Sequence, residues 1–67
     1  MYKKGNENKE RLRSLMTTDP VVTYFDIGRA MEPPRSENSV GRYMRAPDDA
    51  MAAVLERAII RAKRAKL

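Results

Sequence analysis

Apolar residues recur along most of this chain at the three- and four-residue spacing of amphipathic helices. The clearest stripe lies near the C-terminus and consists of Met51, Val54, Leu55, Ala58, Ile59 and Ala62. Acidic residues, Asp48 and Asp49, precede this stripe, and basic residues follow it, so the charges agree with the helix dipole at both ends. The pattern therefore predicts a long final helix over about 48–66.

The N-terminal part of the chain predicts one further helix preceded by a short arm. Residues 1–5 are polar and contain a glycine, so we expect a mobile arm there. From about Asn6 to Met16 the apolar side chains share one face, and charged side chains cover the rest. Asn6 is a residue type that commonly caps a helix. A single folded domain is therefore expected over residues 6–67.

A second helix is expected from about Pro20 to Met31. Asp19 followed by Pro20 is typical of a cap with proline in the first helical turn. A short strand is the alternative for the first half of this segment, which contains residues of high β-propensity: Val21, Val22, Tyr24 and Phe25. The same run continues at helical spacing, which favours the helix. The proline pair at 33–34 then ends it.

The third helix, from about Glu37 to Arg45, carries the pattern most informative about function. Its apolar stripe consists of Val40, Tyr43 and Met44. Ser36 is a candidate cap for it, and Gly28 in the preceding helix would let it pass closely. Two helices joined by a break, the second bearing arginines, are typical of a helix-turn-helix that enters a groove of DNA. This unit is expected over about residues 20–45.

Length and charge narrow the class of protein. A chain of 67 residues is one small domain, and a core of this size rarely contributes more than about 3–5 kcal/mol, so we expect a second copy to add stability. The net charge is +5, and arginines outnumber lysines. Because the guanidinium fork matches phosphates and the guanine edge, this balance favours a nucleic acid as partner. The alternative is a basic surface that only maintains solubility.

Missing residue types exclude several kinds of site. The chain has no cysteine and no histidine, which removes disulfides, zinc fingers, a thiol nucleophile and the commonest general base. Asp48 and Asp49 follow Pro47, an arrangement typical of a helix start rather than a metal site. We expect no enzyme activity, metal, cofactor or small-molecule substrate. No apolar run is long enough for a membrane span or a signal peptide, so a cytoplasmic location is expected.

The segment 23–45 resembles the helix-turn-helix of small phage repressors of the Cro and lambda-repressor-like class. The matching positions are a small residue in the first helix, an aliphatic residue early in the second and a bulky residue three further on: Gly28 or Ala30, Val40 and Tyr43. The chain departs from that class in the turn. There, the proline pair and about two additional residues replace a short turn with glycine.

The small size, the basic balance and the opening Met1-Tyr2-Lys3-Lys4 are also similar to short phage-borne autoregulators. These include the anti-CRISPR-associated repressors, which bind inverted repeats in their own promoters. The resemblance implies a homodimer that binds double-stranded DNA at a near-palindromic operator. It also implies that occupancy of the promoter represses transcription.

The fold class expected from these patterns is all-α, a compact bundle of four to five short helices containing a helix-turn-helix and forming dimers. The candidates for reading bases are Arg42, Asn38, Ser39 and Ser36, of which Ser36 could act only as a cap. The candidates for the DNA backbone are Arg35, Arg45 and Arg29. The candidates for the dimer contact are Val54, Leu55, Ala58 and Ile59.

Two other functions stay open at this point. The first is a small protein-binding module, for instance a phage-encoded inhibitor that presents the basic end of its last helix to an acidic host protein. The second is RNA binding through the arginines, which is less favoured because no group of exposed aromatic residues is evident. The basic cluster Lys63, Arg64 and Lys66 is compatible either with phosphate binding or with an ordinary solvated helix end.

Overall fold

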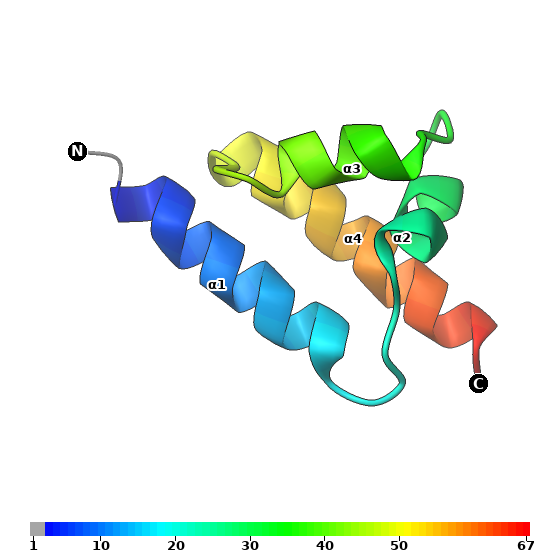
Figure 1. Cartoon of the computed structure of the whole chain (residues 1–67). Helices are drawn as coiled ribbons and strands as arrows, with labels where there is room; N and C mark the ends of the chain where they lie inside the picture. The colour runs from blue at the N-terminus through cyan, green and yellow to red at the C-terminus, as the bar shows by residue number, and fades with distance from the viewer. Residues whose placement is uncertain (1–2) are drawn as a thin grey trace.

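Four helices and no β-strand make up residues 3–67, the part of the chain that the computed structural model describes. The helices are α1 (Lys3–Thr17), α2 (Tyr24–Ala30), α3 (Glu37–Tyr43) and α4 (Asp49–Ala65). Helix α4 runs through the middle of the fold, with α1 on one side and the shorter α2 and α3 on the other (Figure 1). The all-helical class predicted from the sequence is confirmed.

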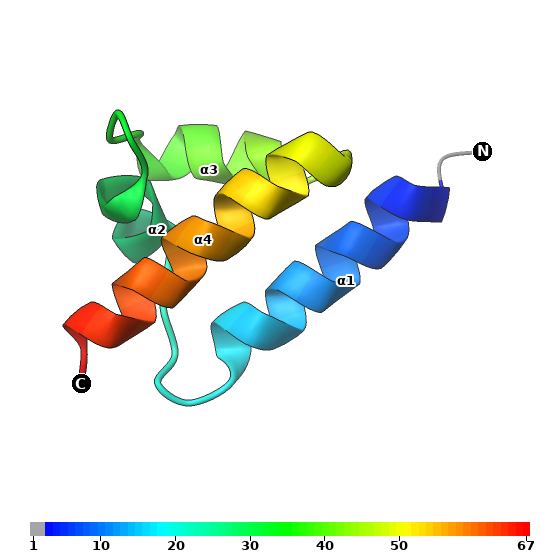
Figure 2. The ribbon, with the colours of Figure 1, turned by 180° about the vertical axis from the view of Figure 1, so that it is seen from behind.

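Helices α1 and α4 lie side by side and run in the same direction (Figure 2). Near their beginnings, the Asn8 side chain donates hydrogen bonds to the Pro47 carbonyl oxygen at 3.0 Å and to Asp49 Oδ1 at 3.1 Å. Farther along, Arg11 forms an ion pair with Glu56. Among the described residues, Asn8 is the only polar residue that is buried. Its hydrogen bonds tie the start of α1 to the loop before α4 and to the first residue of α4.

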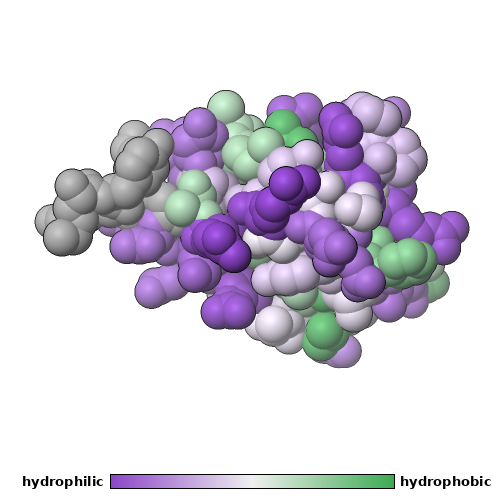
Figure 3. All heavy atoms as spheres, turned by 45° about the horizontal axis from the view of Figure 1, so that its top comes forward, coloured by the Kyte–Doolittle hydropathy of each residue, from purple (hydrophilic) through white to green (hydrophobic). Residues whose placement is uncertain are grey.

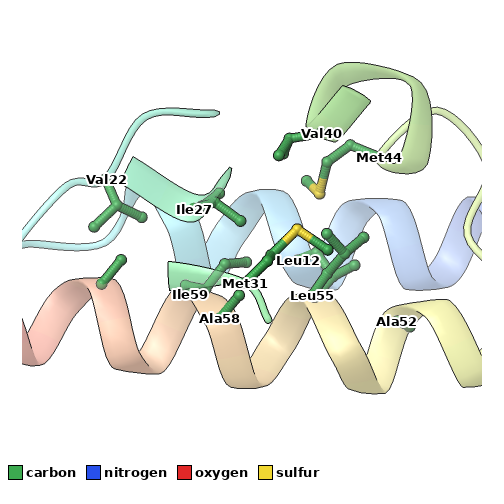
Figure 4. Close-up of a cluster of buried hydrophobic side chains, with 11 residues drawn as sticks. Leu12, Val22, Ile27, Met31, Val40, Met44, Ala52, Leu55, Ala58 and Ile59 are labelled. Carbon is green, nitrogen blue, oxygen red and sulfur yellow. The ribbon is translucent and has the colours of Figure 1, made fainter. Parts of the chain in front are cut away.

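The hydrophobic core gathers side chains from all four helices and from the linker between α1 and α2 (Figure 4). Six of them are entirely excluded from solvent: Leu12, Val22, Ile27, Val40, Leu55 and Ile59. Met31, Met44 and three alanines of α4 complete the cluster. Apart from Val54, the apolar stripes predicted for the third and fourth helices therefore face the core. Burial of these side chains is the main favourable contribution to folding.

The prediction for the start of α2 was wrong. The helix begins at Tyr24, and Thr23 rather than Asp19 caps it: the backbone N–H of Asp26 donates to Thr23 Oγ1, and the backbone N–H of Thr23 donates to the Asp26 carboxylate. This reciprocal pair is a capping box. Val22, just before it, is fully buried in a linker that forms neither helix nor strand.

The remaining helix ends follow the sequence more closely. Ser36 caps α3 by accepting the N–H of Ser39, and Asp48 caps α4 by accepting the N–H of Met51. The cap predicted at Ser36 is confirmed. Helix α1 begins at Lys3, so Asn6 lies inside the helix and residues 3–5 of the expected arm are helical. Residues 1 and 2 of that arm lie outside the described part of the chain.

Candidate nucleic-acid interface

A six-residue loop, residues 31–36, joins α2 to α3 and folds back tightly onto α2. The backbone N–H of Arg35 donates to the carbonyl oxygen of Gly28 at 2.9 Å. A Cβ atom on Gly28 would lie 2.1 Å from the Arg35 carbonyl oxygen and 3.3 Å from Val40 Cγ2. The predicted close approach at Gly28 is therefore confirmed, and it fixes where α3 starts relative to α2.

One side of α3 faces the core, and the opposite side faces solvent. Val40 is completely buried and marks the inner side. Successive helical residues are turned by about 100°, so Asn38 and Arg42 lie on the side opposite Val40, one turn apart, and both are exposed. Figure 3, which turns the α3 side towards the viewer, shows hydrophilic side chains across the middle of this face.

Two further arginines flank this outer side of α3. Arg35 precedes the helix and Arg45 follows it, and both are exposed. We refer to Arg35, Asn38, Arg42 and Arg45 together as the α3 surface. Within the described residues none of these four side chains takes part in a hydrogen bond or ion pair. The three guanidinium groups are therefore available to an anionic partner.

The two serines predicted to read bases contact each other at the start of α3. The Ser36 hydroxyl oxygen accepts the N–H of Ser39 at 3.2 Å, and the two hydroxyl oxygens lie 3.2 Å apart. Ser39 is partly buried and lies at the edge of the outer side. The structure thus groups Asn38 and Arg42 as outward side chains and assigns Ser36 to the cap, the alternative considered for it.

Arg29, the third backbone candidate, belongs to α2 and stacks on a neighbour. Its guanidinium carbon lies 5.5 Å from the centroid of the Phe25 ring, one helical turn earlier. Such a cation–π contact is worth about 0.5–1 kcal/mol at an exposed site. Both residues are exposed. The Arg29 side chain therefore already has a contact partner within the chain, unlike the arginines of the α3 surface.

Much of the basic end of α4 is engaged by the protein itself. Lys63 donates to the carbonyl oxygens of Thr18 and Pro20, which belong to the linker between α1 and α2. The Lys66 ammonium lies 3.2 Å from the Asp26 carboxylate at the start of α2. These lysines tie α4 to the preceding segments, a role that their sequence positions alone did not indicate.

Arg61 makes a similar tie on α4. Its guanidinium donates to the Ala30 carbonyl oxygen at 2.9 Å and to the Glu32 carboxylate at 3.0 Å. Because the last carbonyl groups of a helix lack partners within it, the bond to Ala30 satisfies an acceptor at the end of α2. Arg61 therefore holds the end of α2 against α4.

The Asp26 carboxyl is the described group whose ionisation is clearly altered. Its pKa lies below the ordinary value of 3.8, first because the backbone N–H of Thr23 donates to the ionised form, and second because of Lys66; partial burial opposes the change. The capping box therefore favours the charged state of this carboxylate.

The expected dimer contact on α4 needs a correction. Leu55, Ala58 and Ile59 are 0%, 2% and 0% exposed and belong to the core of the chain itself. They are covered because α1 and α2 both pack against α4. Val54 is the exception, with 43% of its surface exposed. A second copy cannot reach the three buried residues without unfolding the chain.

Comparison with known proteins finds no matching family model, no matching curated protein and no matching solved structure. Between residues 3 and 67 the structure contains no group of three or more acidic side chains placed to hold a metal ion. No helix in that range is both long and apolar enough to cross a membrane.

Proposed function

We propose that the protein is a sequence-specific DNA-binding repressor that acts as a homodimer on an inverted repeat in a promoter. The observation that carries this proposal is the α3 surface. It presents a pair of exposed side chains suited to reading bases, Asn38 and Arg42, between two exposed arginines. The guanidinium groups have no carboxylate partner within the described chain.

The chemistry of these side chains suits a DNA groove. Arginine donates two hydrogen bonds to O6 and N7 of guanine, and asparagine pairs in the same manner with N6 and N7 of adenine. Asn38 and Arg42 are one helical turn apart, so both can reach base edges together. Each good bidentate contact contributes roughly 1–3 kcal/mol of discrimination between bases. Arg35 and Arg45 then hold the phosphates on either side.

The dimensions of α3 also support the proposal. Its seven residues correspond to a length of roughly 10 Å, comparable with the width of the major groove, about 12 Å. Helix α2 packs across α3, and the Gly28 contact holds the loop between them. In the proposal, this pair forms the helix-turn-helix and α3 is its recognition helix.

The resemblance of residues 23–45 to small phage repressors supports the same assignment and adds the second copy. Two recognition helices on one DNA face are separated by about 34 Å, one turn of the duplex, and such a pair demands a near-palindromic operator. Occupancy of an operator that overlaps a promoter blocks transcription. The proposal therefore includes regulation of the protein's own gene or of its neighbours.

The main competing function, capture of an acidic protein by the basic end of α4, has less support. Arg61, Lys63 and Lys66 already contact groups of the same chain. These contacts compete with an acidic partner for the same groups. The α3 surface needs no such displacement to receive phosphates.

A gel-shift titration tests the proposed function. The protein is titrated against a duplex of its own upstream region and against a scrambled duplex of equal length, at two salt concentrations. We expect tight binding to the upstream duplex with two protomers per site, and a weakening by salt that reflects about 0.9 released counterions per phosphate contact. Absence of binding to either duplex at low salt contradicts the proposal and favours a protein partner.

A further inference from the structure

We infer that two copies of the chain associate through the side of α4 marked by Val54. This inference rests on the proposed function only in that two α3 helices must face one DNA duplex. The surface, here called the Val54 surface, consists of Tyr43, Ala46, Ala50, Met51 and Val54. It replaces the core residues Leu55, Ala58 and Ile59 as the candidate dimer contact.

Val54 lies between two hollows in the surface. One, of about 430 Å³, lies between the C-terminal end of α3 and the first turns of α4, and apolar side chains line most of it. The other, of about 170 Å³, lies beside the end of α2 and includes Met31 and Arg57. An exposed aliphatic side chain between two hollows is suited to insertion into the matching hollow of another molecule.

A second copy of the chain is the occupant that this surface fits. In a two-fold symmetric interface the same patch meets itself, so it must be self-complementary. The hollow at one end of the surface carries an anion, Asp48, and the hollow at the other end carries a cation, Arg57. A two-fold rotation about an axis through Val54 turns the acidic end of one copy towards the basic end of the other. Such complementarity orients the two copies and leaves Arg42 to the α3 surface.

The area required is compatible with the size of the chain. A specific interface covers about 800 Å² on each partner, and the chain exposes 4757 Å² in all. One interface would thus occupy about a sixth of the surface. The two hollows joined by Val54 run along α4 from the end of α3 to the end of α2, and the interface would lie over both, with Arg42 outside its edge.

The position of this surface beside α3 separates it from the other exposed side of α4. Helix α4 lies between α3 and α1 in both views (Figures 1 and 2). Val54 shares its hollow with the C-terminal end of α3, whereas Ile60 shares another with Arg11 of α1. Contact on the Val54 side would join the two copies next to their α3 helices, whereas contact on the Ile60 side would join them next to α1.

The matched variants Val54→Arg and Ile60→Arg test the assignment. Both residues are aliphatic, both belong to α4, and their exposed fractions are 43% and 39%. Sedimentation equilibrium of the free protein measures the dimer dissociation constant. Because a hot-spot residue at the centre of an interface contributes a factor of about thirty or more, we expect Val54→Arg to raise the dimer dissociation constant by at least that factor. Ile60→Arg should leave it within about twofold of wild type.

Circular dichroism and thermal melting of both variants establish that they fold. A crosslinking experiment gives an answer even if the arginine variant unfolds. The chain has no cysteine, so Val54→Cys or Ile60→Cys introduces a single thiol. With a short bismaleimide, we expect covalent dimers from the Val54→Cys protein and not from the Ile60→Cys protein.

Three results overturn the inference: wild type that is monomeric at every concentration tested, a Val54→Arg dimer as tight as wild type, or covalent dimers from the Ile60→Cys protein and none from the Val54→Cys protein. Failure of the proposed function looks different. In that case the protein dimerises through Val54 but binds no duplex in the gel-shift titration. Conversely, DNA binding with an unaffected Val54→Arg dimer refutes only the location of the interface.

Discussion

The contact at Gly28 leads to a quantitative prediction about the pair of helices proposed to bind DNA. A Cβ atom introduced by Gly28→Ala would lie 2.1 Å from the Arg35 carbonyl oxygen. This distance is 0.9 Å shorter than 3.0 Å, the shortest contact that Cβ atoms in proteins normally make. The atom it meets belongs to the backbone, so the loop between α2 and α3 must move. That movement also weakens the 2.9 Å hydrogen bond from the Arg35 N–H to the Gly28 carbonyl.

The expected cost combines three contributions. Overpacking in a close contact costs about 1–3 kcal/mol, and loss of the backbone hydrogen bond adds about 1 kcal/mol. Alanine regains at most about 1 kcal/mol of helix propensity over glycine. We therefore expect Gly28→Ala to lower the free energy of unfolding by about 1–3 kcal/mol. For a domain of this size each kcal/mol lowers Tm by about 4–8 °C.

Gly41 provides the matched control, because it lies inside α3 and the nearest atoms to its added Cβ are Tyr24 ring carbons at 3.7 Å. This is an ordinary contact, so Gly41→Ala should leave stability unchanged or raise it by up to about 1 kcal/mol. Urea and thermal unfolding followed by circular dichroism measure both variants. If Gly28→Ala is as stable as wild type, the loop is not held as described and this reasoning is refuted.

Two further predictions concern side chains that hold the helices together. Asn8→Ala removes both hydrogen bonds to the start of α4 and leaves the Pro47 carbonyl without that donor. We therefore expect it to lower the free energy of unfolding by about 1–3 kcal/mol, whereas the exposed control Asn6→Ala should cause no loss. Equal melting temperatures for the two variants would disprove this role of Asn8. The second prediction concerns Asp26, whose pKa is lowered in the folded state. Its carboxylate therefore stabilises the fold above the unfolded pKa of about 3.8. This stabilisation is lost as the pH falls through the lower pKa of the folded state. Unfolding curves recorded between neutral pH and pH about 2 should show a smaller acid-induced loss for Asp26→Ala than for wild type. Identical losses would contradict stabilisation of the Asp26 carboxylate by Thr23 and Lys66.

The helices with a continuous apolar stripe could be predicted from the sequence. The stripe through Leu55 and Ile59 predicted α4 to within one residue at each end, and Val40 with Met44 gave the inner side of α3. In both cases the cap residue directly precedes the helix, so local hydrogen bonding and burial indicate the same boundary. Such agreement between levels makes a boundary readable from sequence alone.

The start of α2 could not be read in the same manner, because two signals compete there. Asp19-Pro20 is typical of a helix start, but Val22 is needed in the core, and a helix from Pro20 would compete with the capping box at Thr23. The spacing Thr23-x-x-Asp26 was available in the sequence and would have identified the true cap.

The candidate site shows a different limit. Asn38 and Arg42 could be placed on the outer side of α3 by helical periodicity, because they are opposite Val40. The sequence could not show which basic side chains contact other groups of the chain, because those contacts are distant in sequence. Arg61 donates to Glu32, and Lys63 donates to the Pro20 carbonyl oxygen. The same holds for the dimer contact: an apolar stripe does not say whether its own chain or a second copy covers it.

The most direct test of the central claim compares Arg42→Ala with Arg13→Ala in DNA binding. Arg13 is an exposed arginine of α1, so both variants lose one positive charge and only one lies on the α3 surface. Fluorescence anisotropy gives the ratio of affinities for the upstream duplex and a scrambled duplex. We expect Arg42→Ala to reduce this ratio about 5–150-fold, the equivalent of about 1–3 kcal/mol, and Arg13→Ala to leave it unchanged. An unaltered ratio in Arg42→Ala would contradict base reading by α3.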